Sequence, residues 1–309
     1  MSAIKQSAKA IKRIIMFFVY GIKTSDSIAL KLNRELIIIP FFENLYTKRF
    51  CKLYLKKDGE KAYFDFMGAR FPDISKTKDM RELAAIFEDV LLVPCFFDDS
   101  YDRKTVEKID LYTKEGPYGY KDGTFDVRVK AGDVVIDAGA WIGDFSAYCS
   151  SKGATTYAFE PTKQMYDWLQ QTKELNEEAG GGKINTIAAA LGDRTGEMDI
   201  FIETRSSGAN SISMDRGEIK ETIAVVKLDD FVKENNIEKV DFIKADIEGA
   251  ERDLLRGATE VLKTFAPKIA ICTYHLPDDP EVLEEIIKTA NPAYTVIQMR
   301  HKLFAAVVK

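Results

Sequence analysis

The residues best suited to bind a ligand form a short turn, Asp137-Ala-Gly-Ala-Trp-Ile-Gly143. The apolar run Asp133-Val-Val-Ile-Asp137 before it is typical of a buried strand, and residues 143–151 after it are typical of a helix. In an open α/β sheet, ligands bind beyond the carboxyl ends of the strands. Gly139 lets the backbone turn sharply and approach a ligand closely, and Gly143 lets the helix begin tightly against the strand. The turn therefore predicts a ligand site, where the Asp137 carboxylate would suit a cationic or amino group.

The spacing of the glycines distinguishes two classes of nucleotide ligand. A dinucleotide-binding turn has the pattern Gly-x-Gly-x-x-Gly, and its helix N–H groups bind a pyrophosphate. This chain has Gly-x-x-x-Gly instead and lacks the middle glycine that admits the pyrophosphate. The spacing favours a nucleoside ligand without phosphate, although helix–strand packing alone would also explain a lone Gly-x-x-x-Gly.

An acidic residue, Glu160, ends the next predicted strand, Thr155–Phe159. One carboxylate can accept hydrogen bonds from both hydroxyls of a ribose. Pro161 keeps Glu160 out of helical geometry and fixes the exit of the strand. A solvated acid at a helix start is the alternative interpretation. The glycine turn upstream favours the ribose role.

The segment Asp241-Phe-Ile-Lys-Ala-Asp-Ile-Glu-Gly-Ala-Glu251 places charged residues in and directly after a predicted central strand. Lys244 and Asp246 share one face of that strand because side chains alternate with a period of two. A buried lysine needs a charged partner, so we expect Asp246 to pair with it and to emerge at the carboxyl end. Glu248 and Glu251 follow at a helix start. Helix capping is the alternative for all three acids; it is favoured for Glu251 and evenly matched for Asp246.

His275 follows the fifth predicted parallel strand and is one of only two histidines; the other, His301, lies in the terminal turn. An imidazole at the carboxyl end of a central strand can act as a general base near neutral pH. A hydrogen-bonded structural histidine is an equally supported interpretation. Asp246 is the second candidate for the base.

The elements that must position these residues alternate between strand and helix after residue 115, which predicts an α/β fold with helices on both faces of a mostly parallel sheet. The expected strands are 133–137, 155–159, 184–190, 197–203, 222–228, 240–245 and 268–273, and the expected helices are 143–151, 162–178, 229–235, 250–264 and 280–290. A terminal pair, 294–299 and 303–308, adds an antiparallel hairpin. Before residue 115, we expect helices at 3–20 and 79–92 and a hairpin around Asp58-Gly59. The predicted domains are therefore an α+β extension, 1–114, for acceptor or oligomer contacts, and a main domain, 115–309.

The composition of the 309-residue chain excludes several classes of protein. With 46% hydrophobic and 30% charged residues it is an ordinary globular chain, and its net charge of -5 argues against a nucleic-acid binder. The four cysteines lack Cys-x-x-Cys spacing, which indicates reduced thiols of a cytoplasmic protein. The apolar run Ile14–Tyr20 is too short to span a membrane, so we expect an amphipathic helix there and no transmembrane segment.

Together, these motifs resemble the FkbM family of methyltransferases. The resemblance is carried by residues 115–118, 130–143, 159–161, 226–231, 241–251 and 255–258, and it covers roughly residues 115–309. It is specific because Lys-x-Asp-x-Glu-Gly-x-Glu follows the glycine turn in the family's order. The resemblance implies a Rossmann-like class I methyltransferase fold with a seven-stranded sheet. It also implies transfer of a methyl group from S-adenosylmethionine to a hydroxyl of a sugar or secondary metabolite.

The resemblance also implies roles for individual residues. Those expected to bind S-adenosylmethionine are Tyr118, Asp137, Gly139, Ala140, Gly143, Glu160, Ala190 and Asp246. Tyr118 would cover the methionine end, and the region 190–193 would lie by the adenine. The expected catalytic residues are His275, Asp246 and Lys244. The family often has Asn at the position of Trp141, so no polar contact is expected from that side chain.

Several alternatives stay open. No metal is assigned, although Mg²⁺ on Asp246 and Glu248 is an alternative within the same class of enzyme. A NAD(P)-dependent oxidoreductase and a non-catalytic binding module with the same fold are the rival functions. The expected partner is a small-molecule or glycan hydroxyl acceptor, read by the N-terminal part and the loop 206–216, and a homo-oligomer is compatible with the sequence.

Overall fold

The computed structural model describes residues 55–59, 61–66, 68–73, 102–103, 106–107, 117–202 and 219–308. The predicted helices 3–20 and 79–92 and the loop 206–216 lie outside these residues. No helix in the described part of the chain is long and apolar enough to cross a membrane.

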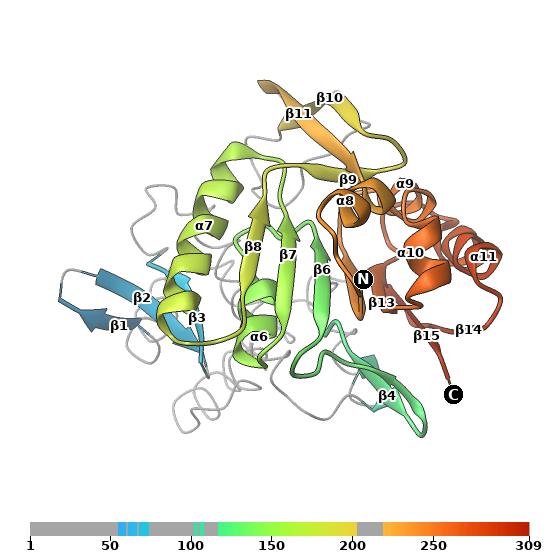
Figure 1. Cartoon of the computed structure of the whole chain (residues 1–309), viewed down its shortest axis with the longest axis horizontal. Helices are drawn as coiled ribbons and strands as arrows, with labels where there is room; N and C mark the ends of the chain where they lie inside the picture. Colours follow the sequence, from blue (N-terminus) through green and yellow to red (C-terminus); the bar gives the residue numbers. More distant parts are fainter. Residues whose placement is uncertain are drawn as a thin grey trace, which may run out of the picture.

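A seven-stranded sheet forms the centre of the molecule (Figure 1). Its strands, in spatial order, are β14 (Tyr294–Gln298), β15 (Lys302–Val307), β13 (Lys268–Cys272), β12 (Phe242–Ala245), β6 (Val134–Ala138), β7 (Thr155–Phe159) and β8 (Ile184–Ile187). The pairs β12–β13, β12–β6, β6–β7 and β7–β8 are parallel, and β15 is antiparallel to both of its neighbours. This arrangement confirms the predicted mostly parallel sheet with an antiparallel C-terminal hairpin.

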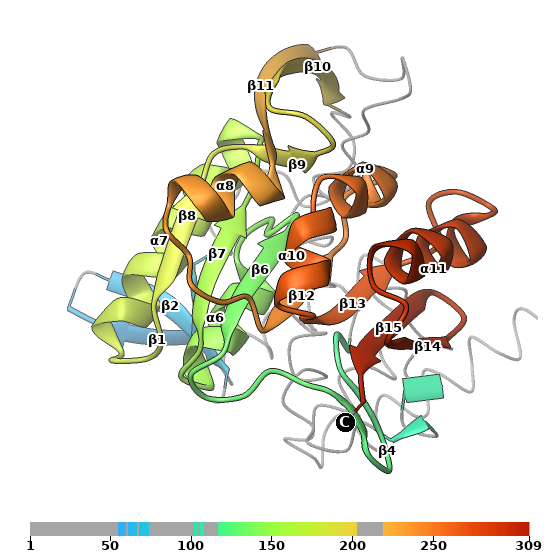
Figure 2. The same ribbon diagram turned by 45° about the vertical axis from the view of Figure 1, so that its right-hand side comes forward.

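Helices cover both faces of this sheet, as predicted. They are α6 (Asp144–Ser151), α7 (Lys163–Glu178), α8 (Leu228–Glu234), α9 (Glu251–Arg256), α10 (Thr259–Thr264) and α11 (Asp279–Ala290). The first two pack on one face and the other four on the opposite face, where Figure 2 shows α8 and α10 in front of the strands. In α7 the buried residues recur every three or four positions, at Met165, Leu169, Thr172 and Asn176. This spacing places about one buried residue per turn on the same face of the helix, and that face lies against the rest of the domain.

Two predicted elements are divided in the structure. The single helix expected at 250–264 is α9 followed by α10, interrupted at Gly257. A Cβ on Gly257 would lie 2.0 Å from the carbonyl oxygen of Gly192, so the two backbones touch directly where the helix breaks. The strand expected at 184–190 ends at Ile187, and Ala190–Gly192 forms a separate strand, β9.

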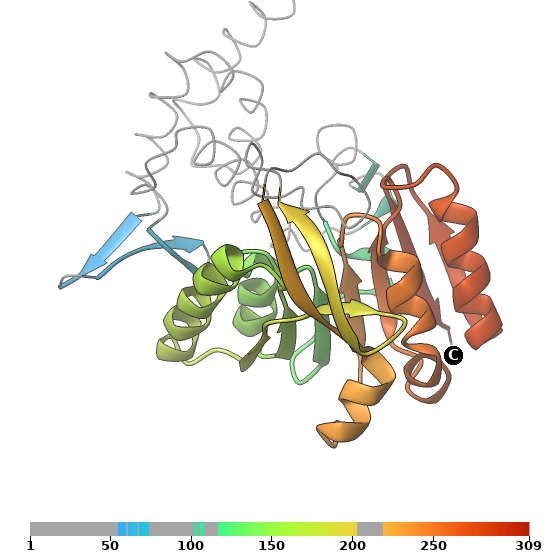
Figure 3. The same ribbon diagram turned by 90° about the horizontal axis from the view of Figure 1, so that it is seen from above.

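Strand β9 belongs to a second, three-stranded sheet. It pairs in parallel with β11 (Ile219–Lys227), which pairs antiparallel with β10 (Gly196–Ile202). Figure 3 shows β10 and β11 side by side. Both strands were predicted from the sequence, but their pairing with β9 was not. A strand of three residues is too short to show the alternation of side chains by which strands are predicted.

Two smaller antiparallel sheets lie in the N-terminal half. Strands β1 (Leu55–Asp58) and β2 (Lys61–Phe66) confirm the predicted hairpin, and β3 (Ala69–Pro72) adds a third strand that was not predicted. Strands β4 (Tyr120–Asp122) and β5 (Phe125–Val127) form a second hairpin, and the ring of Tyr120 stacks on Phe304 of β15.

Asn176 of α7 joins the β1–β3 sheet to the main domain. Its Oδ1 accepts the backbone N–H of Arg70 at 3.0 Å, and its Nδ2 donates to the carbonyl of Arg70 at 2.8 Å and to that of Thr172 at 2.7 Å. The side chain is buried, so these bonds replace water completely. The described part of the N-terminal extension is therefore tied to α7 through backbone groups, while the domain boundary near residue 115 stays a prediction.

We expect Asn176→Ala to lower the free energy of unfolding by about 1–3 kcal/mol, because it leaves backbone groups of Arg70 without partners. Urea unfolding followed by circular dichroism measures this change. Gln171→Ala, on the exposed face of the same helix, is the matched control and should stay within about 0.5 kcal/mol of wild type. Equal stability of the two variants would contradict the role given to Asn176.

Candidate active site

The glycine turn lies at the carboxyl end of β6 and requires glycine at both ends. Gly139 and Gly143 have φ values of +72° and +88°. A Cβ on Gly139 would lie 2.1 Å from the carbonyl oxygen of Asp246, and one on Gly143 would lie 2.8 Å from the Leu169 side chain. The backbone N–H groups of Gly139 and Ala140 both donate to the carbonyl of Phe159 at the end of β7. The turn is thus fixed between the ends of β7 and β12.

Trp141 occupies the middle of the turn with a φ of +50°. This left-handed conformation is rare for residues other than glycine, asparagine and aspartate, which explains why asparagine suits the position. The backbone N–H of Trp141 donates to Glu160 at 3.1 Å. The indole Nε1 is buried and has no hydrogen-bond partner among the described residues. Trp141 therefore stabilises the turn through its backbone N–H, and its buried indole N–H has no acceptor among the described residues.

Glu160 is buried beside the turn, with 6% of its surface exposed. Its Oε1 accepts the backbone N–H of Thr162 at 2.9 Å and the Thr162 hydroxyl at 2.5 Å, and its Oε2 accepts the N–H of Trp141. Burial raises the pKa of Glu160 to about 7, although these donors act in the opposite direction. A carboxylate oxygen can accept two hydrogen bonds, so Oε2 can take a further donor from a ligand.

Lys244 of β12 is buried directly behind the turn. Its Nζ donates to the carbonyl of Gly139 at 2.6 Å and lies 3.2 Å from Asp137 Oδ1, while Asp137 Oδ2 accepts the hydroxyl of Ser146 at 2.6 Å. Burial disfavours the ammonium, but the charges of Asp137, Asp246 and Asp144 outweigh it and raise the pKa of Lys244. The lysine therefore keeps its charge.

Two sequence-based expectations change at this pair. The predicted charge partner of Lys244 was Asp246, whereas its ion pair is with Asp137, the residue opposite it on β6. Asp137 was expected to meet a cationic ligand, but its carboxylate is fully buried and meets Lys244 and Ser146 instead. Asp137 therefore supports the turn from inside the protein, through its contacts with Lys244 and Ser146.

Asp246 lies where β12 ends, in contact with the turn. Its Oδ2 accepts the hydroxyl of Tyr118 at 2.8 Å, and its Oδ1 accepts that of Tyr274 at 3.0 Å. The ring of Tyr118 lies 5.2 Å from Nζ of Lys244 and 5.1 Å from Nζ of Lys302. Two phenols thus orient the carboxylate. The sequence did not predict Tyr274, and its position directly before His275 was the signal that could have found it.

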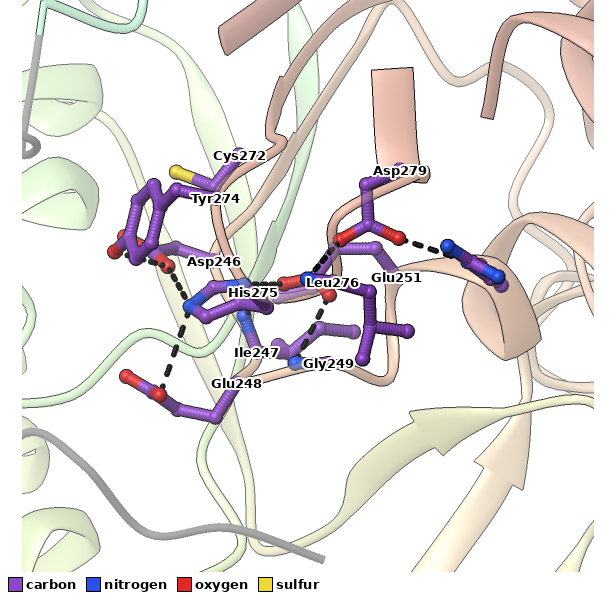
Figure 4. Close-up of polar contacts among 12 residues, drawn as sticks. Asp246, Ile247, Glu248, Gly249, Glu251, Cys272, Tyr274, His275, Leu276 and Asp279 are labelled. Carbon is purple, nitrogen blue, oxygen red and sulfur yellow. Dashed lines mark hydrogen bonds and ion pairs between the residues drawn. The ribbon is translucent and has the colours of Figure 1, made fainter. Parts of the chain in front are cut away.

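His275 lies among three carboxylates (Figure 4). Its Nδ1 is 2.9 Å from Oε1 of Glu251, and its Nε2 is 3.5 Å from Oδ1 of Asp246 and 3.5 Å from Oε2 of Glu248. Burial favours the neutral ring, but the Glu251 carboxylate and the charges of Asp246 and Glu248 outweigh it and raise the pKa of His275 to about 9. At neutral pH the charged ring therefore predominates, and only the minor neutral form can accept a proton or bind a metal ion.

Glu251 caps the start of a helix and also belongs to the candidate site, the two roles that were alternatives in the sequence analysis. Its carboxylate accepts the backbone N–H groups of Ile247 and Gly249, as a residue at a helix start should, and it also contacts His275. The sequence favoured capping alone and missed the contact with the imidazole, because that contact joins segments 24 residues apart along the chain.

Arg252 and Asp279 hold the loop after β13 in place. Arg252 donates to Asp279 at 2.8 Å and to Asp278 at 2.6 Å, and Asp279 accepts the backbone N–H of Leu276 at 2.8 Å. Figure 4 shows Asp279 and Leu276 of this network next to His275. No motif in the sequence indicated this network.

The expected adenine region, 190–193, follows β8 closely. The backbone N–H of Glu160 donates to the carbonyl of Ile187 at 3.1 Å, so the ends of β7 and β8 adjoin. Ala190 begins β9 three residues after Ile187 and is partly buried. A contact between Ala190 and a ligand stays a prediction.

Comparison with known proteins supports the motifs found here. Residues 137–294, just over half of the chain, match the methyltransferase FkbM domain. Over 159 residues the chain is 28% identical to the hexuronic acid methyltransferase AglP of Haloferax volcanii, covering 52% of this chain and 63% of that protein. Over 209 residues it is 26% identical to the 31-O-demethyl-FK506 methyltransferase FkbM of Streptomyces tacrolimicus, covering 58% and 79%. The match with AglP thus spans less than two thirds of that relative.

Among solved structures, the methyltransferase FkbM of Methylobacillus flagellatus aligns with a TM-score of 0.47 and 21% identity, covering 75% of this chain and 56% of that one. The family model spans the glycine turn, Glu160 and the cluster around His275. The chain belongs to the family of proteins with a methyltransferase FkbM domain.

Proposed function

We propose that this protein transfers the methyl group of S-adenosylmethionine to a hydroxyl oxygen of a sugar or secondary metabolite. The observation that carries the proposal is the buried Glu160 carboxylate, which lies against a turn with glycines at 139 and 143 and retains an open acceptor site on Oε2. The family and the two named relatives support methyl transfer, and the relatives' names support a hydroxyl-bearing acceptor.

The residues at the turn fit S-adenosylmethionine better than a dinucleotide. The second glycine of a dinucleotide turn would stand at position 141, where this chain has Trp141. Its third would stand at position 144, where Asp144 adds a carboxylate beside the place of the pyrophosphate. A nucleoside ligand has a ribose that Glu160 can bind and has no phosphate, so neither Trp141 nor Asp144 would oppose its binding.

Bound S-adenosylmethionine supplies a methyl group on a positively charged sulfur, which is already a good electrophile. Transfer would break the carbon–sulfur bond with its electrons left on sulfur, form a carbon–oxygen bond, and pass the hydroxyl proton to Asp246 or to the neutral form of His275. The protein must chiefly align the two reactants and exclude water. Lys244 acts here as a positioning residue, because its enclosed ammonium holds the carbonyl of Gly139. Asp246 and His275 are the groups placed to meet the hydroxyl.

Ligand binding separates this proposal from its rivals. We expect S-adenosylhomocysteine to raise the melting temperature and NADH to leave it unchanged. Glu160→Gln should weaken S-adenosylhomocysteine binding at least about tenfold, since charge-assisted hydrogen bonds to the ribose are lost. Glu197→Gln, an exposed acid on β10, is the matched control. Stabilisation by NADH alone would favour an oxidoreductase, and stabilisation by neither would favour a non-catalytic module.

The affinity for S-adenosylhomocysteine should also depend on pH. The ionised Glu160 can accept a ribose hydroxyl at the open site on Oε2, whereas a proton on the carboxyl group would occupy that site. Because its pKa is about 7, affinity should fall by about tenfold as pH drops from 8 to 6. Isothermal titration calorimetry at both pH values measures this, and Glu160→Gln should lose the dependence. An equal dependence in that variant would point to another group, such as Asp144, whose pKa burial raises to about 6.

His275→Ala should reduce turnover by about 100-fold or more and leave the affinity for S-adenosylhomocysteine nearly unchanged. The ring contacts Asp246, Glu248 and Glu251 and not the glycine turn. Formation of S-adenosylhomocysteine with a uronic-acid glycan as acceptor measures the rate. Full activity in the variant would remove His275 from the mechanism.

A further inference from the structure

The imidazole of His275 points one nitrogen at two carboxylates without a hydrogen bond to either. The side chain is 8% exposed, and Nε2 lies 3.5 Å from both Asp246 Oδ1 and Glu248 Oε2. Hydrogen bonds between such atoms are normally 2.7–3.2 Å long, and no described residue gives the ring nitrogens one of good geometry. The buried ring thus faces two acceptor oxygens across gaps that are too wide for a shared proton.

These gaps suit a metal ion. Ligand atoms about 2.1 Å from one ion lie about 3.0–3.5 Å apart when their angles at the ion are between octahedral and tetrahedral. We propose that His275 Nε2, Asp246 and Glu248 form a binding site for one divalent cation, with Glu251 holding the imidazole from its other side. Asp246 and His275 belong to a group of three residues whose ligand atoms lie within 4.8 Å of one another; the third member is Glu251, so the half-buried Glu248 must turn toward the ion to complete the proposed set.

The groups around these ligands are those that an ion site requires. A metal-binding histidine usually has a carboxylate beside its other ring nitrogen, and here Oε1 of Glu251 lies 2.9 Å from Nδ1. Coordinating carboxylates are themselves hydrogen-bonded, and Asp246 receives the hydroxyls of Tyr118 and Tyr274. With Glu251 beside Nδ1, the other ring nitrogen, Nε2, faces an oxygen of Asp246. Glu248 lies on the same side of the ring as Nε2 (Figure 4).

The charges of the cluster also call for a cation. Three carboxylates surround one imidazole, and two described cations nearby have their ion pairs with other carboxylates. Lys244 pairs with Asp137, and Arg252 pairs with Asp278 and Asp279. A divalent ion would balance the carboxylates more fully than a single proton on His275.

One nitrogen and two oxygen ligands indicate an ion such as Mn²⁺ or Zn²⁺ and disfavour Ca²⁺, which prefers six or more oxygens. The Mg²⁺ alternative considered from the sequence used Asp246 and Glu248 only, and the structure adds His275 as the third ligand. The role of the ion rests on the proposed function: beside the glycine turn it would bind the acceptor hydroxyl oxygen and make its proton easier to lose. Binding of the ion itself does not depend on that role.

Electron paramagnetic resonance of Mn²⁺ added to the EDTA-treated full chain tests the site. We expect one saturable Mn²⁺ site, with affinity at least about tenfold lower in His275→Gln and in Glu248→Gln. Glu260→Gln, which removes an exposed acid on α10, should bind Mn²⁺ as wild type does. No saturable site, or binding that persists in both ligand variants, overturns the proposal and leaves the proton as the occupant.

Thermal shift with S-adenosylhomocysteine on the same preparations keeps the two proposals separate. A shift without Mn²⁺ binding overturns the metal site alone, and Mn²⁺ binding without a shift overturns the cofactor proposal alone. The shift also shows that each variant is folded. If His275→Gln fails to fold, Glu248→Gln at its half-buried position decides the outcome.

Discussion

The buried ion pair between Lys244 and Asp137 is the constraint on which the rest of the site depends. Two opposite charges taken out of water are stable only when their remaining hydrogen-bonding groups also find partners. Here those partners are the carbonyl of Gly139 and the hydroxyl of Ser146, so the pair joins two central strands, the turn and the first helix after it. The loss of either charge would leave the other buried and unpaired.

That constraint brings two separate motifs to one edge of the sheet. Gly139 touches the backbone of Asp246, and Asp246 is in turn held by two tyrosines. The proposed cofactor turn and the cluster around His275 are therefore neighbours through direct contact. A methyl donor bound at the turn and an acceptor bound at the cluster would meet at this edge without any large movement of the strands.

Local signals in the sequence predicted the strands, the glycine turn and Glu160, because period, glycine spacing and strand ends are short-range properties. The contacts that needed the fold were missed. Asp137 and Lys244 are neighbours only because β6 and β12 pair in one particular register. The break at Gly257 occurs where Gly192 from a distant strand touches it, and Glu251 reaches His275 because β12 and β13 pair in parallel, so that the segments after them adjoin. Charge partners across strands cannot be read from the spacing of residues along one of them.

The joint at Asn176 has a consequence for how the family can diversify. Its amide bonds to the main chain of Arg70 rather than to a side chain, so it recognises the path of β3 and not its composition. The same bonds would form with another side chain at position 70, whereas Ala69 and Phe71 beside it are buried in the hydrophobic core. Position 70 can therefore change in sequence while β3 keeps its place on α7, but its two neighbours must stay apolar to keep the strand packed.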